Sequence, residues 1–94
     1  MNTISYKKIR DFVKRYPESE SSLHAWYKIA KKATWKNLVE LRLDYPHADL
    51  VGRVIVFNIA GNNYRLIAEI HFTSQLLLIR EILTHKEYDK GKWK

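Results

Sequence analysis

The stretch that decides the fold is VGRVIVFNIAGNNYRLIAEIHF, residues 51–72. It is rich in β-branched and aromatic residues, which favour strands over helices. The segment GNN at 61–63 interrupts it, and glycine and asparagine tolerate the positive φ angles of tight turns. The pattern predicts two strands, residues 51–59 and 64–72, joined by a short turn.

A third strand is predicted over residues 76–83, after a turn at Thr73-Ser74. Three strands joined by short turns form an antiparallel meander. Successive side chains of a strand point to opposite faces of the sheet. On the second strand the apolar face carries Leu66, Ala68, Ile70 and Phe72, and we expect it to pack on helices. The other face carries Arg65, Ile67, Glu69 and His71, and it is available to solvent or substrate.

The sequence before residue 46 has helical rather than strand-like spacing. Apolar residues recur at helical intervals over 4–16, 23–33 and 35–43. Pro17 ends the first segment, because proline disfavours α geometry in the residue before it. The serines at 19–22 provide an N-cap region for the second. The prediction is a single α+β domain, residues 1–94, with N-terminal helices packed on one face of a small antiparallel sheet.

The composition points to a polyanionic partner. Seventeen Lys and Arg against ten Asp and Glu give a net charge of +7. Small basic domains commonly bind nucleic acid, although the same positive charge is also compatible with a surface that contacts only water. The chain has no cysteine, so disulfides, thiolate zinc sites and cysteine catalysis are excluded. A small domain without disulfides, a signal peptide or a long apolar run is expected in the cytoplasm.

Familiar catalytic signatures are missing. There is no phosphate-binding glycine loop, no G-x-S-x-G and no H-E-x-x-H. The four histidines, at positions 24, 47, 71 and 85, lack the spacing of metal ligands on a helix. We therefore expect neither a metal site nor a cofactor.

The second half of the chain resembles the HigB family of bacterial toxins, a branch of the RelE-like mRNA interferases. The specific resemblance covers residues 54–89. It is carried by VFN at 56–58, GN at 61–62, YRL at 64–66, IR at 79–80 and THKEYD at 84–89.

The resemblance implies a function as well as a fold. The RelE-like fold packs N-terminal helices on one face of a twisted antiparallel sheet. The implied activity is metal-independent cleavage of mRNA in the A site of the translating 70S ribosome. The implied protein partner is a cognate HigA-like antitoxin, expected to contain a helix-turn-helix, and no membrane is involved.

Three residues are candidates for catalysis: Arg65, His85 and Tyr88. Arg65 matches the arginine that contacts phosphate in RelE-like enzymes, and a guanidinium can grip a phosphate with two hydrogen bonds. Histidine is the side chain best suited to proton transfer near neutral pH, and a tyrosine can stack on a base or move a proton. Each has a structural alternative: an ion pair of Arg65 with Glu69, a His85 bonded to its own loop, and a Tyr88 packed on the sheet edge.

Three further cations, Arg80, Lys86 and Lys90, are candidate RNA contacts. Arg80 interrupts the apolar run of the third strand, where an unpaired buried arginine would be costly. It therefore needs an anion, which is either RNA or the carboxylate of Glu69 or Glu81.

Several other polar and aromatic residues are expected to be structural. Asn62 suits a left-handed turn position, and Asn58 is expected to tie the end of the first strand. Trp26, Tyr27 and Trp35 have helical spacing and are expected in the core.

Two rival functions are compatible with the same residues. One is a non-catalytic RNA- or DNA-binding module, in which arginines and aromatics only bind. The other is a degenerate toxin that acts only together with its antitoxin.

Overall fold

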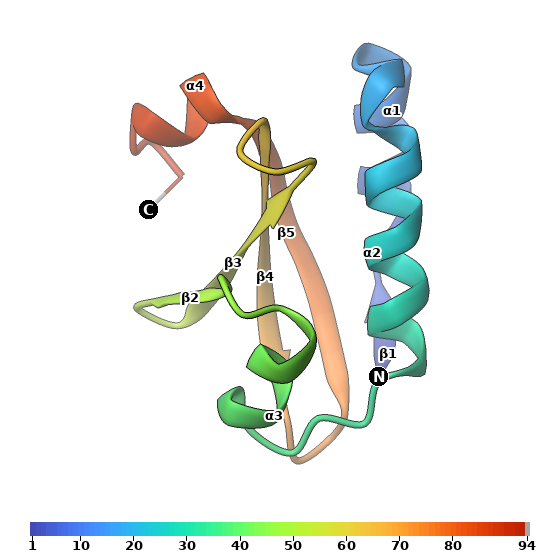
Figure 1. Ribbon diagram of the computed structural model, residues 1–94, viewed down its shortest axis with the longest axis vertical. Coiled ribbons are helices and arrows are strands. Elements are labelled where there is room, and N and C mark those ends of the chain that lie inside the picture. The colour runs from blue at the N-terminus through green and yellow to red at the C-terminus, as the bar shows by residue number, and fades with distance from the viewer. Residues whose placement is uncertain (94) are drawn as a thin grey trace.

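The change of periodicity near residue 50 corresponds to a change from helices to strands in the computed structural model, which describes residues 1–93 (Figure 1). The helices are α1 (Tyr6–Arg15), the 3-10 helix η1 (Pro17–Ser19), α2 (Glu20–Lys32), α3 (Leu38–Asp44) and α4 (His85–Asp89). The strands are β1 (Asn2–Ile4), β2 (Asp49–Val51), β3 (Val54–Ile59), β4 (Tyr64–His71) and β5 (Leu76–Thr84).

The five strands form one sheet in the order β1-β5-β4-β3-β2. Neighbours from β2 to β5 are antiparallel, which confirms the predicted meander and the α+β class. The edge strand β1 pairs parallel to β5, with Asn2 opposite Leu76, so the whole sheet is mixed. β1 was not predicted from the sequence, because three residues are too few to show an alternating pattern.

The strand predicted over residues 51–59 is interrupted near its start: Val51 is the last residue of β2, and β3 begins at Val54. The chain reverses at Gly52-Arg53, between β2 and β3, and Gly52 has a φ of 61°. A positive φ is readily adopted by glycine because it has no Cβ. This hairpin was not predicted because β-branched residues, which favour strands, stand on both sides of its turn.

The helices begin where local capping allows. Ser5 has a φ of 78°, which turns the chain out of β1, so α1 begins at Tyr6 and Ile4 belongs to the sheet. The side chain of Asn37 accepts a hydrogen bond from the Glu40 N–H at 2.9 Å, so α3 begins at Leu38 rather than at residue 35. None of the helices in residues 1–93 has the length and apolar character needed to cross a bilayer.

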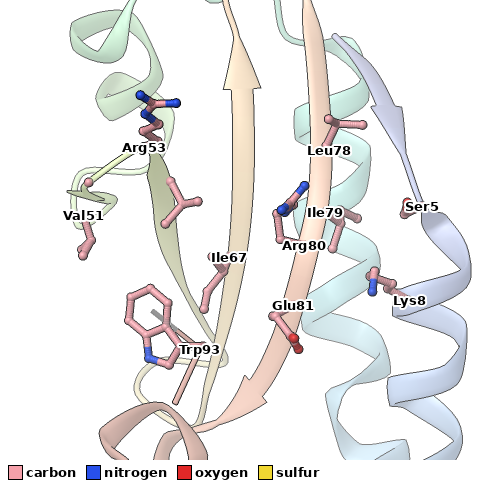
Figure 2. A pocket seen from close by; sticks show the side chains of 12 residues that line it. Ser5, Lys8, Val51, Arg53, Ile67, Leu78, Ile79, Arg80, Glu81 and Trp93 are labelled. Carbon is pink, nitrogen blue, oxygen red and sulfur yellow. The ribbon is translucent and has the colours of Figure 1, made fainter. Parts of the chain in front are cut away.

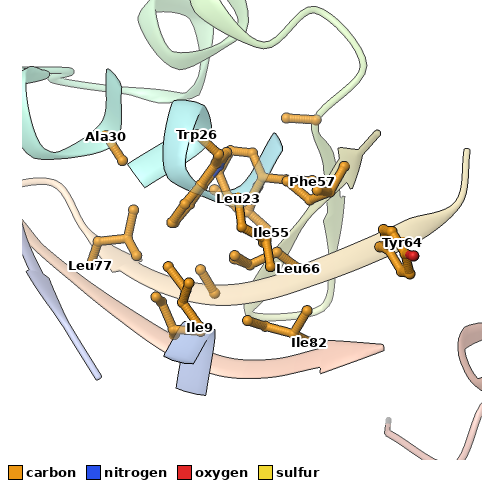
Figure 3. Packing of buried hydrophobic residues seen from close by; sticks show 14 of the residues in the cluster. Ile9, Leu23, Trp26, Ala30, Ile55, Phe57, Tyr64, Leu66, Leu77 and Ile82 are labelled. Carbon is orange, nitrogen blue, oxygen red and sulfur yellow. The ribbon is translucent and has the colours of Figure 1, made fainter. Parts of the chain in front are cut away.

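The core lies between the sheet and the helices α1 and α2, which cover one face (Figures 1 and 3). As predicted, the Leu66 face of β4 packs into it, and Trp26 and Trp35 are buried there. Tyr27 is only half-buried against this cluster. The buried cluster comprises Met1, Ile9, Phe12, Leu23, Trp26, Ala30, Trp35, Leu41, Ala48, Ile55, Phe57, Ile59, Tyr64, Leu66, Ala68, Leu77, Ile79 and Ile82.

The opposite face of the sheet is less open than expected. Arg65 is 7% exposed and Ile67 only 2%. Figure 1 shows α4 on the side of the sheet away from α1 and α2. Among the residues of β4 on this face, only His71 at the far end is exposed.

The register of β5 against β4 shifts at Arg80. Ile67 lies opposite Glu81 and Ala68 opposite Ile79, so Arg80 is the extra residue of a bulge. A bulged residue is left out of the ladder and can be aimed outward. This explains how an arginine fits into an apolar strand: its side chain is exposed.

The packing predicts a large penalty for truncating Leu66. It is fully buried at the centre of β4. Leu66→Ala should lower the free energy of unfolding by ~2–5 kcal/mol, because a cavity remains. Val39→Ala, at a side chain 75% exposed, should change it by no more than about 0.5 kcal/mol. Denaturant titration measures both, and equal losses would contradict this core.

Candidate active site

The candidate active site forms where β4 begins and β5 ends. Tyr64 lies opposite Thr84 and Arg65 opposite Leu83, so the start of β4 is beside the first residue of α4, His85. The backbone N–H of His85 donates to the Asn63 carbonyl at 2.9 Å. The sheet register therefore brings Arg65 close to His85, although 20 residues separate them in the sequence.

A capping box fixes the direction in which α4 leaves the strand. The Thr84 hydroxyl accepts from the Glu87 N–H at 3.2 Å, and the Glu87 carboxylate accepts from the Thr84 N–H at 2.9 Å. These two bonds satisfy amides that would otherwise lack partners. This helix was not predicted from the sequence, because five residues cannot show a helical period.

The guanidinium of Arg65 is held by neutral acceptors. Nη1 donates to the carbonyls of Asn62 and Tyr64, at 3.0 and 3.1 Å. Nη2 donates to Asn62 Oδ1 at 2.7 Å and lies 3.3 Å from His85 Nδ1. Among the described residues, no carboxylate lies within salt-bridge distance of it, so the alternative of an ion pair with Glu69 is wrong.

A buried cation without a carboxylate is an attractive site for an anion. Hydrogen bonds from neutral groups orient the guanidinium and satisfy its N–H groups, but they do not cancel its charge. Electrostatic attraction is also stronger away from bulk water. In this conformation the four terminal N–H groups already have partners, so a phosphate must displace one of them or bind through Nε.

His85 is fixed at both ring nitrogens. Arginine is only a donor, so Nδ1 must accept from Arg65. Nε2 lies 3.1 Å from Asp89 Oδ2, one turn along α4. In the neutral ring the proton is therefore on Nε2, where it can be donated to Asp89, and Nδ1 carries the lone pair.

Tyr88 is the third residue of the site cluster, which consists of Arg65, His85 and Tyr88. The Arg65 guanidinium lies over its ring, 5.3 Å from the centroid. The ring also stacks on Trp93, with centroids 5.0 Å apart and planes inclined by 15°. The structure thus brings together all three residues predicted to be catalytic.

Tyr64 anchors the strand immediately before Arg65. Its hydroxyl donates to Glu18 Oε1 at 3.0 Å, and its ring packs edge-on against Phe12. Burial, and then the hydrogen bond and charge of Glu18, raise the pKa of Tyr64. The phenol therefore stays protonated and keeps donating to η1.

A cavity of about 530 Å³ opens beside Arg65 and Tyr88. Two basic side chains that sequence analysis did not select, Arg42 of α3 and His47, also line it. Arg42 Nε donates to the Ala48 carbonyl at 3.0 Å. No sequence signal connected α3 to this site, because only the folded chain brings the α3–β2 loop against β3 and β4.

The asparagines have different roles from those expected. The left-handed residues of the β3–β4 turn are Ala60 and Gly61, with φ of 53° and 66°, so the backbone prediction for Asn62 was wrong. Asn62 instead accepts two hydrogen bonds from Arg65. Asn58 is exposed and lines the cavity opposite Arg65 in the β3–β4 register.

The three predicted RNA-contact cations do not join this cluster. Arg80 lies on the bulge and bridges to Glu69 at 3.6 Å, one of the two carboxylates expected as alternatives. Lys86 and Lys90 are exposed on or just after α4, and Lys90 lines a different, smaller cavity with Glu87. Within residues 1–93, no three His, Asp or Glu side chains gather as metal ligands would.

The geometry at His85 predicts its tautomer. At a pH where the ring is neutral, ¹⁵N chemical shifts should identify a protonated Nε2 and an unprotonated Nδ1. The exposed His24 of α2 provides the reference spectrum. A proton on Nδ1 would contradict the bond from Arg65.

The capping box predicts the effect of Thr84→Ala. Losing an N-cap hydroxyl typically costs ~1 kcal/mol, and here the loss should be concentrated in α4. Amide hydrogen exchange should accelerate at residues 86–89 while β3 and β4 stay protected. Thr84→Ser, which keeps the hydroxyl, is the matched control. Unchanged exchange in the alanine variant would show that the Thr84 cap does not stabilise α4.

Comparison with known proteins identifies the family. The family model HigB_toxin, described as the RelE-like toxic component of a toxin-antitoxin system, matches residues 19–91. The mRNA interferase toxin HigB of Escherichia coli (strain K12) is 35% identical over 92 residues, which cover 95% of this chain and 88% of that protein. The mRNA interferase HigB of Escherichia coli O6:H1 is 30% identical over 93 residues, which cover 96% and 90%. Because the family model spans most of the chain and both relatives align along nearly all of it, the chain belongs to the HigB family of RelE-like toxins.

Proposed function

We propose that this protein is the toxin of a toxin-antitoxin module and an endoribonuclease that cleaves mRNA. The family assignment supports the toxin role, and the relatives named mRNA interferases support the activity. The single observation that carries the chemistry is the buried Arg65 guanidinium, held beside His85 and Tyr88 without a carboxylate partner.

Cleavage without a metal uses the RNA's own 2′-hydroxyl as the nucleophile. The bond from O2′ to phosphorus forms and the bond from phosphorus to O5′ breaks. The 2′-hydroxyl proton must be accepted by a base, and the leaving O5′ must receive a proton from an acid. Negative charge accumulates on the phosphate oxygens, where a fixed cation stabilises the transition state.

Arg65 and His85 are coupled in this mechanism. When a phosphate oxygen takes the Nη2 donor of Arg65, Nδ1 of His85 loses its partner and becomes free to accept a proton. Asp89 keeps the other ring nitrogen protonated and stabilises the imidazolium that results. Tyr88 lines the cavity beside Arg65, where its hydroxyl can donate a proton to the leaving O5′.

The partners follow from the same proposal. The substrate is mRNA in the A site of the 70S ribosome, which positions the strand for in-line attack. A HigA-like antitoxin with a helix-turn-helix restrains the toxin. Translation takes place in the cytoplasm, which is therefore the proposed location. A short helix-turn-helix reading frame beside the gene would support this pairing.

The experiment is induction of the protein in cells, followed by primer extension on translated messages. Growth should stop, and cleavage sites should appear within translated codons. Purified ribosome complexes should be cut, and a 2′-deoxy nucleotide at the cleavage site should block the reaction. Intact messages from abundant folded protein would instead favour the binding-only alternative.

Substitution of Arg65 tests the residue that carries the mechanism. Arg65→Ala should reduce cleavage by about 10²–10³-fold, the usual effect of losing a transition-state donor. Because Arg65 is buried and bonded, the variant should also melt earlier, so rates must be corrected for the folded fraction. Arg10→Ala, at an exposed arginine of α1, is the control. A corrected rate equal to wild type would remove Arg65 from the chemistry.

A further inference from the structure

A second and larger cavity, of about 710 Å³, lies on the sheet face that carries Ile67. Figure 2 shows Arg53, Arg80 and Trp93 around Ile67, each from a different part of the chain. Arg53 comes from the β2–β3 turn, Arg80 from the β5 bulge and Trp93 from the segment after α4. Neither the family description nor the names of the relatives give this groove a role.

The charged lining of the groove is mainly positive. Lys8, Arg53 and Arg80 contribute three cations, and Glu81 is the one carboxylate among the lining residues described. Arg80 also contacts Glu69, at 3.6 Å from Nη1, with its own side chain 58% exposed. Exposed ion pairs of this kind are weak, so Arg80 can exchange its partner for a phosphate.

The aromatic lining connects the groove to the candidate active site. Trp93 lines the groove, and Tyr88 lines the cavity beside Arg65. The two rings stack on each other, and Trp93 Nε1 donates to the Tyr88 carbonyl at 3.0 Å. The Tyr88–Trp93 pair therefore lies between the two cavities, with Trp93 in the wall of the groove and Tyr88 in the wall of the cavity beside Arg65.

We propose that this groove binds the single-stranded RNA that flanks the scissile nucleotide. Arg53 and Arg80 contact its phosphates, and an unstacked base packs against Trp93. Cations that follow a backbone, combined with an aromatic ring for base stacking, are the usual means of binding single strands. The inference rests on the proposed function, because it places the flank next to the cleavage site.

Such a groove contributes affinity but not sequence choice. Phosphates are the same in every message, and every base offers a face for stacking. The groove therefore holds whatever nucleotides adjoin the cleavage site.

Binding and cutting are separated by using a 2′-O-methyl RNA oligonucleotide, which cannot supply the nucleophile. Fluorescence anisotropy at several salt concentrations should give weaker binding for Arg53→Ala and Arg80→Ala. Each lost phosphate contact lowers the salt slope by ~0.7 for a single strand. Trp93→Ala should weaken binding by about 5-fold to 100-fold, with Trp93→Phe retaining most of it.

Lys28→Ala removes an exposed lysine of α2 that lines neither cavity, and it should bind like wild type. The proposal is overturned if wild type binds and cleaves RNA while the groove variants match Lys28→Ala in affinity and salt slope. It is also overturned if those variants lose only antitoxin binding, since the groove would then be a protein interface. Failure of wild type to cleave translated mRNA would instead count against the proposed function.

Discussion

The placement of the Arg65 guanidinium is the constraint on which the site depends. It joins the β3–β4 turn through Asn62, the start of β4 through the Tyr64 carbonyl, and α4 through His85 and Tyr88. A buried charge is tolerated only when its hydrogen bonds are satisfied, so each of these neighbours is held in place by the same group. The acceptors are neutral, so they leave the positive charge of Arg65 uncompensated in the wall of the cavity.

This arrangement gives Arg65 two roles that compete for the same N–H groups. In the structure its terminal N–H groups serve the fold, whereas phosphate binding requires at least one of them to change partner. The bond to His85 Nδ1 is the longest of the four, at 3.3 Å, and joins the half-exposed ring of His85. Exchange at that bond costs least, and it is also the exchange that releases a proton acceptor. Structural and catalytic functions can therefore share one residue because one of its four bonds is replaceable.

Much of the fold could be read from local pattern. Strands β4 and β5 and the helix α1 were predicted nearly to their ends, because alternation and helical spacing persist over eight or more residues. β1, the β2–β3 hairpin and α4 could not be predicted, because each is set by three to five residues whose conformation depends on partners elsewhere. The bulge at Arg80 has the same origin: only the register against β4 determines that this residue is left out of the ladder.

For the site, the sequence by itself determined the residue types and, through the motifs at 64–66 and 84–89, the family. It could not determine that Arg65 is buried, that its acceptors are neutral, or that Arg80 lies apart from it in another groove. Those features arise from the pairing of Arg65 with Leu83 across the sheet and from the capping box that turns α4 back over β4. Arg42 and His47 reach the cavity for a similar reason, since α3 and the loop that follows it meet β3 and β4 only after folding. Composition and spacing are properties of the chain. The burial of a side chain and its hydrogen-bond partners depend on contacts between distant segments, so only the tertiary structure decides them.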